Sequence, residues 1–90
     1  MSTFLIGYDL NKPEQDYPEL INAIETSFGK WWHYLDSTWL IKSDLSATDI
    51  RDKLKPHIDS DDELLVVRLS GEGAWAGFSS EASDWLQENL

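Results

Sequence analysis

The side chain most suited to chemistry is the carboxylate of Asp9, which ends an alternating apolar segment that begins at Thr3. A carboxylate at the end of a strand lies beside the following loop and stays accessible to ligands. Magnesium is commonly held by one or two carboxylates together with water. Asp9 therefore predicts a metal site mainly if a twofold axis brings two copies together. The alternative is an Asx-type turn into Leu10 and Asn11.

The two histidines are weaker candidates for catalysis. An imidazole can act as an acid or a base near neutral pH, but no residue near His33 in the sequence could orient it. His57 follows Pro56 in a predicted loop, and two distant histidines in a chain without cysteine match no zinc ligand pattern. We interpret both histidines as structural, and no nucleophile with a base at a readable spacing can be proposed.

An aromatic segment between residues 31 and 39 is the most unusual feature of the chain. It predicts two strands around a tight bend at residues 36–37, or one long bulged strand. Because side chains alternate along a strand, Trp32 and Tyr34 point to one side, whereas Trp31 and His33 point to the other. We predict a contact surface made of Trp31, Trp32, His33, Tyr34 and Trp39.

Residues 3–42 predict a strand, a helix and then the aromatic hairpin. The alternation of residues 3–9 is typical of a strand. The apolar stripe that follows has helical spacing, with Asp16 as the expected N-cap and Gly29 as the expected left-handed residue after the helix.

The second half of the chain predicts another helix and another strand. Ser46 has the position of an N-cap, and Pro56 should end or kink the helix that follows it. The nearly continuous apolar run at residues 64–69 predicts a central strand covered on both faces. Residues 75–78 are expected to form an edge strand, and Ser80 to cap a last short helix.

This order of elements predicts an α+β fold, a ferredoxin-like βαββαβ two-layer sandwich with a short C-terminal extension, in one domain spanning residues 1–90. Both helices then cover one face of the sheet, and the aromatic side chains on the other face need a cover. A homodimer, the segment at residues 75–90 folding back, and a ligand or another protein are the three alternatives.

The chain is strongly acidic, with seventeen Asp and Glu against seven Lys and Arg and a net charge of −10. A field of this sign repels nucleic acid and anionic membranes. We expect no membrane association, because no apolar run approaches the length of a spanning helix, and a cytoplasmic location. The acidic surface serves solubility, or it contacts a basic partner.

Three stretches carry a resemblance to known proteins. Residues 4–10, with the pair Tyr8-Asp9, resemble the opening strand of the small CRISPR-associated adaptation subunit, the minor partner of the spacer integrase. Residues 29–40 are similar to that family's glycine followed by two short strands with a serine between them, and residues 64–69 to its fourth strand. The chain also resembles the small bacterial proteins labelled SinR-like. The resemblance implies a homodimer of ferredoxin-like subunits with Asp9 at the position of the family's metal-binding aspartate.

We therefore expect a non-catalytic homodimeric module that binds or regulates a partner, without a cofactor. One alternative is a weak metal-dependent nuclease that uses Mg²⁺ and paired Asp9 carboxylates. Another is an acidic decoy for a protein that binds nucleic acid.

Overall fold

The computed structural model describes residues 1–10 and 18–90. The elements follow in the order β1 (Ser2–Asp9), α1 (Pro18–Ser27), β2 (Trp31–Leu35), β3 (Thr38–Ser43), α2 (Ala47–Leu54), a 3-10 turn η1 (Lys55–His57), β4 (Glu63–Arg68) and α3 (Ser80–Asn89). The predicted first strand, the aromatic hairpin and the helix after Ser46 are all confirmed. The N-cap predicted at Asp16 lies outside the described residues.

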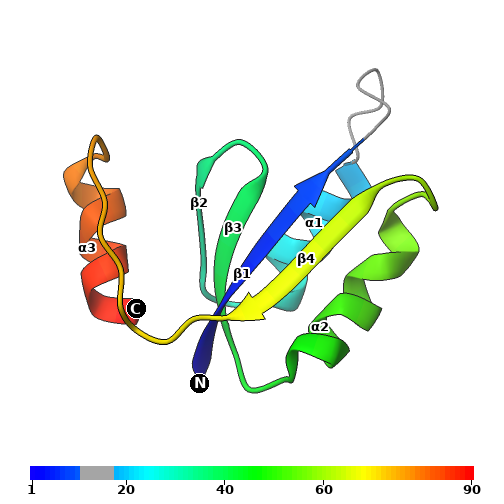
Figure 1. Ribbon diagram of the computed structural model, residues 1–90, viewed down its shortest axis with the longest axis horizontal. Helices are drawn as coiled ribbons and strands as arrows, with labels where there is room; N and C mark the ends of the chain where they lie inside the picture. Colours follow the sequence, from blue (N-terminus) through cyan, green and yellow to red (C-terminus); the bar gives the residue numbers. More distant parts are fainter. Residues whose placement is uncertain (11–17) are drawn as a thin grey trace.

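The four strands form one antiparallel sheet in the order β2-β3-β1-β4 (Figure 1). β1 and β3 occupy the centre, and Phe4 on β1 lies opposite Ile41 on β3 and Arg68 on β4. The even-numbered residues of β1 therefore point to one face of the sheet, and the odd-numbered residues point to the other.

Helices α1 and α2 pack against the first of these faces and enclose the main core (Figure 1). This core contains Phe4, Ile6, Leu20, Ile24, Phe28, Trp39, Ile41, Ile50 and Leu54. Ser46 caps α2 as predicted, because its Oγ accepts a hydrogen bond of 3.1 Å from the Asp49 N–H. Pro56 lies in η1, where the α-helix has ended.

The end of α1 differs from the sequence prediction. Gly29 is not left-handed, because positive φ angles among the glycines occur only at Gly71 and Gly77. The side chain of Phe28 is buried, and its N–H donates to the Ile24 carbonyl at 3.3 Å. The end of α1 is thus held in place by the packing of Phe28 into the core, and not by a left-handed conformation of Gly29.

Strand β4 is an edge strand, so the prediction of a central strand covered on both faces is wrong. It pairs with β1 alone among the described strands. Leu64 and Val66 pack against the main core on the face covered by α2, whereas Leu65 and Val67 are exposed on the other face. The apolar run marked a strand correctly, but its position in the sheet depends on which strands pair with it.

The second face of the sheet is partly covered by the C-terminal segment, one of the three covers left open by the sequence. Trp32, Leu40, Ala82 and Leu86 form a second buried cluster, joined by the partly buried Trp75 and Phe78. Residues 75–78 form no strand, and Ser79, not Ser80, is the N-cap of α3, accepting from the Ala82 N–H at 3.2 Å. The end of α3 is held to the sheet by the Thr3 hydroxyl, which donates to the Asn89 carbonyl.

No helix within residues 1–10 and 18–90 combines the length and the apolar character needed to cross a membrane.

Candidate functional site

The five residues predicted to form an aromatic contact surface are divided between the two faces of the sheet and between interior and surface. Trp32 is 3% exposed and Trp39 is fully buried, so neither can contact a partner. Trp32 lies under α3, where its Nε1 donates to the Ala82 carbonyl at 3.1 Å and its ring meets Phe78 edge-on. The prediction that these two indoles belong to an open surface is wrong, because the chain itself covers them.

On the first face, Trp39 contacts Tyr8, Trp31 and His33, whereas the Tyr34 ring packs against Trp32 on the second face. The Trp39 Nε1 donates to the Tyr8 hydroxyl at 3.0 Å, and the His33 ring stacks on the Trp39 ring with centroids 3.7 Å apart. His33 Nε2 also lies 3.2 Å from the Asp36 carbonyl. These contacts agree with a structural role for His33. They supply the orienting neighbours that could not be recognised in the sequence.

Exposed apolar side chains remain on both faces of the hairpin. Trp31 is 40% exposed, and Tyr34 and Leu35 are exposed to a similar extent. All three lie on β2, the edge strand furthest from β4.

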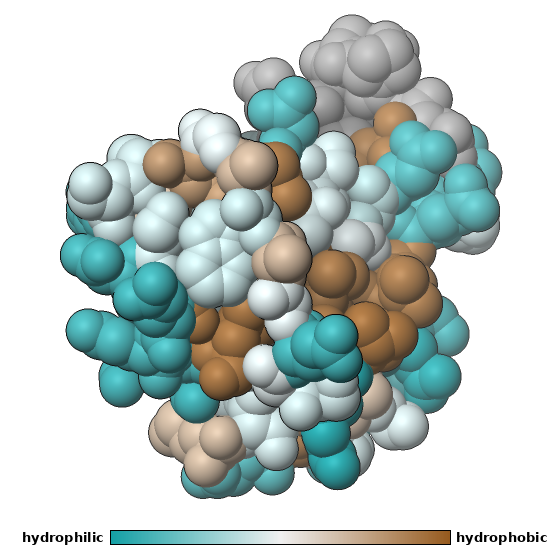
Figure 2. Space-filling view, turned by 60° about the vertical axis from the view of Figure 1, so that its left-hand side comes forward, coloured by the Kyte–Doolittle hydropathy of each residue, from teal (hydrophilic) through white to brown (hydrophobic). Residues whose placement is uncertain are grey.

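Another apolar surface lies on β4, beside the part of this face that the C-terminal segment covers. Leu5 on β1 faces Val67 across the two strands, and Leu65 lies beside Gly7. Leu65 is 57% exposed, more than any other apolar side chain of the sheet. Figure 2 shows hydrophobic side chains reaching this surface of the molecule. Leu5 is partly buried against the cluster under α3, so we call only the exposed pair Leu65 and Val67 the open half-face.

Asp9 is exposed at the end of β1 and faces Glu63, the first residue of β4. The two acidic residues line a shallow hollow of about 360 Å³ together with Gly7, Tyr8, Leu64 and Leu65. A single chain thus offers two carboxylates at this position, which could hold Mg²⁺ with water as further ligands. Sequence reasoning missed Glu63 because the partner of Asp9 is defined only by the pairing of β1 with β4.

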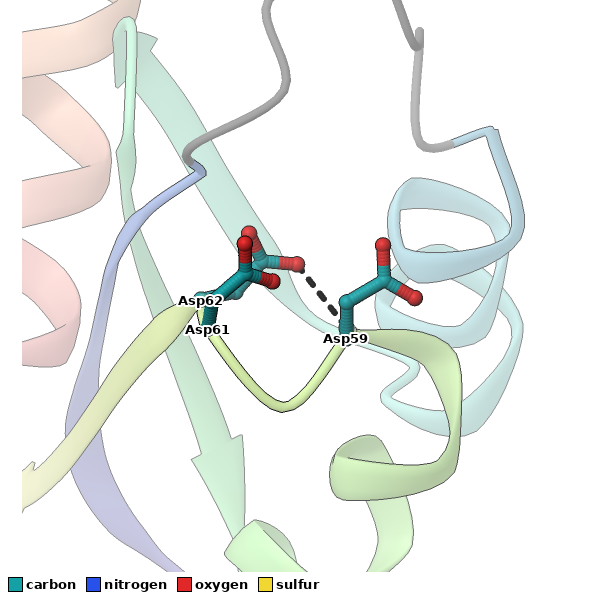
Figure 3. Close-up of side chains that lie close together, drawn as sticks. All are labelled: Asp59, Asp61 and Asp62. Carbon is teal, nitrogen blue, oxygen red and sulfur yellow. Dashed lines mark hydrogen bonds between the residues drawn. The ribbon is translucent and has the colours of Figure 1, made fainter.

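Three further carboxylates gather in the loop before β4. Oxygen atoms of Asp59, Asp61 and Asp62 lie within 4.8 Å of one another (Figure 3). Asp62 Oδ2 accepts a hydrogen bond of 2.8 Å from the Asp59 N–H, which closes the loop. This hydrogen bond explains why the three carboxylates lie close together. Their charges also make the electrostatic potential near Asp9 more negative.

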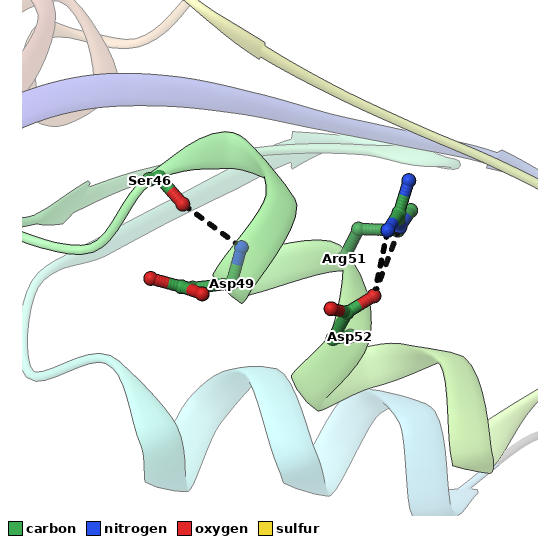
Figure 4. Close-up of polar contacts among 4 residues, drawn as sticks. All are labelled: Ser46, Asp49, Arg51 and Asp52. Atoms are coloured by element: carbon green, nitrogen blue, oxygen red, sulfur yellow. Dashed lines mark hydrogen bonds and ion pairs between the residues drawn. The ribbon is translucent and has the colours of Figure 1, made fainter.

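Two basic residues of the segment from α2 to η1 lie beside acidic side chains. Arg51 donates from Nε and Nη2 to the neighbouring Asp52 carboxylate at 3.0 and 2.9 Å (Figure 4). His57 Nδ1 lies 4.0 Å from a Glu19 carboxylate oxygen. Acidic side chains thus lie beside Arg51 on α2 and His57 in η1.

Comparison with known proteins adds no family to this description. No family model matches the chain, and no solved structure matches it.

Proposed function

We propose that the chain is a non-catalytic binding module that works as a homodimer. The observation that carries this proposal is the open half-face, an apolar surface on an edge strand within an otherwise strongly acidic molecule. An exposed apolar edge strand is a common site of association between chains.

The arrangement of possible catalytic groups also favours a binding role. His33 is stacked on Trp39 and His57 lies beside Glu19, so each imidazole has a structural contact. Within the described part of the chain, neither histidine is paired with a serine or threonine hydroxyl as an activating base would be. The exposed aromatic residues Trp31 and Tyr34 remain available on the hairpin for a further protein partner.

We also propose that the architecture is ferredoxin-like. The strand order β2-β3-β1-β4 supports this, because β3 then lies between β1 and β2 as in a split βαβ unit. The packing of α1 and α2 on one face supports it as well. The relation to SinR-like proteins and to the small CRISPR adaptation subunit stays a prediction.

Sedimentation velocity over a range of protein concentrations tests the homodimer. We expect the weight-average mass to rise from that of the 10.3-kDa chain towards twice this value as the concentration increases. A single species with the mass of one chain at every concentration would overturn the proposal. High salt should strengthen the association, because it screens the repulsion between two chains that each carry a net charge of −10.

A metal-dependent nuclease is the second candidate, and the carboxylate pair of Asp9 and Glu63 is the observation that favours it. Incubation with Mg²⁺ or Mn²⁺ and with single- and double-stranded RNA and DNA tests this function. Cleavage that disappears in Asp9→Asn and persists in the exposed control Asp49→Asn would replace the binding proposal with the nuclease. The absence of cleavage in all mixtures would eliminate the nuclease.

A further inference from the structure

We propose that the second copy of the chain binds at the outer edge of β4, so that two β4 strands pair antiparallel about a twofold axis with Leu65 at its centre. This inference rests on the proposed homodimer and assigns its interface. The resulting sheet continues from β2 of one copy to β2 of the other.

The backbone of β4 leaves a free row of hydrogen-bonding groups on its outer side. The Leu69 N–H donates to the Thr3 carbonyl at 2.9 Å. The backbone N–H and C=O groups of the odd-numbered residues of this segment are therefore directed towards β1. In an antiparallel ladder the alternate residues point the other way, which directs the N–H and C=O groups of Leu64, Val66 and Arg68 outward. Among residues 1–10 and 18–90, none of the turn or loop backbone hydrogen bonds involves these three residues.

The side chains of β4 lack the features that usually protect an edge. Protected edge strands carry a proline, a bulge or a charged residue in the middle of the strand. Here residues 64–67 are Leu-Leu-Val-Val, and charges occur only at the two ends, Glu63 and Arg68. The register of β4 with β1 is continuous, so no bulge turns the edge away.

The charge distribution of this strand favours a second copy as the occupant. In an antiparallel pair the end of one strand lies beside the start of the other. A twofold axis at Leu65 brings Arg68 of each copy level with Asp62 of the other, the bend residue just before β4, whose carboxylate also accepts the Asp59 N–H. Opposite charges in facing positions stabilise strand pairs. The positive end of β4 thus meets the acidic loop that precedes β4 in the other copy, twice.

The same register joins apolar side chains on both faces of the sheet. Leu65 faces Leu65 of the second copy at a closely spaced, non-hydrogen-bonded position, which extends the open half-face across the axis. On the other face Leu64 lies opposite Val66 of the second copy. Beside this edge, a groove of about 250 Å³ between α2 and β4 leaves room for these side chains, lined by Ala47, Thr48, Arg51, Leu64, Leu65 and Val66.

This arrangement separates the homodimer from the paired-carboxylate nuclease. Asp9 is paired with Glu63 across β1 and β4. With the axis at Leu65, Glu63 is in turn paired with Val67 of the second copy. The two Asp9 residues are then three strand spacings apart and offset by four residues, a separation of about 20 Å with strands about 4.8 Å apart and a rise of about 3.4 Å per residue. One metal ion cannot bridge that distance, so an edge-paired dimer does not join two Asp9 carboxylates.

Two matched variants test the interface by sedimentation. Leu65→Lys puts two ammonium groups next to each other at the axis, and we expect at least a tenfold rise in the dissociation constant, or about 1.4 kcal/mol. Leu35→Lys changes a leucine that is similarly exposed, at 46%, on the opposite edge of the sheet, and we expect no change. Far-ultraviolet circular dichroism checks that both variants fold. A dimer weakened equally by both substitutions, or by neither, would overturn the edge assignment and leave the homodimer standing.

Amide hydrogen exchange of the unmodified protein tests the backbone pairing independently. We expect the amides of Leu64, Val66 and Arg68 to exchange rapidly in dilute protein and to become protected at dimer-forming concentrations. The amides of Leu65 and Val67 should be protected at both, because they point towards β1. Association without added protection at the outward amides means that the copies meet through the faces of the sheet, and the edge assignment fails. A monomer at every concentration instead removes the proposed function itself.

Discussion

Replacing Trp32 with alanine tests whether this indole is part of the protein core or of an interface. Trp32 is 3% exposed under α3, in contact with Phe78 and hydrogen-bonded to the Ala82 carbonyl. Tryptophan buries roughly 150 to 250 Å² of surface, and at about 25 cal/mol per Å² its loss costs roughly 4 to 6 kcal/mol. Measured truncations of large core side chains cost about 3 to 5 kcal/mol. We therefore expect Trp32→Ala to lower the free energy of unfolding by about 4 kcal/mol, a large part of the 5 to 15 kcal/mol typical of a domain.

Urea unfolding followed by circular dichroism measures this change, with Trp31→Ala as the matched control. Trp31 is the adjacent residue on the opposite face and is 40% exposed, so its truncation should cost clearly less. Trp32→Phe keeps an aromatic ring and removes the indole N–H, with an expected loss of about 1 kcal/mol. Equal destabilisation by Trp31→Ala and Trp32→Ala would refute the enclosure of Trp32. So would a Trp32→Ala variant that is as stable as the unmodified protein.

Three further predictions concern backbone conformation and helix capping. Gly77 has a φ of +86° with no atom within 4 Å of an added Cβ, so Gly77→Ala should cost about 1 kcal/mol from backbone strain alone, measured by urea unfolding. Gly29 has no positive φ and equally open surroundings; Gly29→Ala should be neutral or stabilise by up to about 1 kcal/mol, and a loss there would contradict the described end of α1. Ser46→Ala removes the α2 cap and should lower the melting temperature through a loss of about 1 kcal/mol, whereas Ser46→Asp should retain most of the stability.

Of the candidate site, the sequence identified residue types but not their neighbours. The exposed carboxylate of Asp9 was recognised at the end of its strand, whereas its proximity to Glu63 was not. The two residues are far apart in sequence, and only strand pairing brings them together. Likewise, the two faces of the aromatic strand were predicted correctly, but the burial of Trp32 by Ala82 and Phe78 depends on where α3 folds back.

The sequence by itself determined the local elements of this protein. The alternation of residues 3–9 predicted a strand, Ser46 marked the start of a helix, and the polar bend at residues 36–37 favoured a hairpin over one long bulged strand. These features succeed because side-chain periodicity and capping depend on residues a few positions apart.

Only the tertiary structure decided which strands lie at the edges of the sheet and which half of its second face is covered. The apolar run of β4 is compatible with a central strand and with an edge strand, and the difference depends on β1 pairing with β3 on its other side. Long-range pairing is selected by the total burial of the whole chain, which no local pattern contains. For that reason the exposed backbone edge of β4, on which the proposed dimer depends, became visible only in three dimensions.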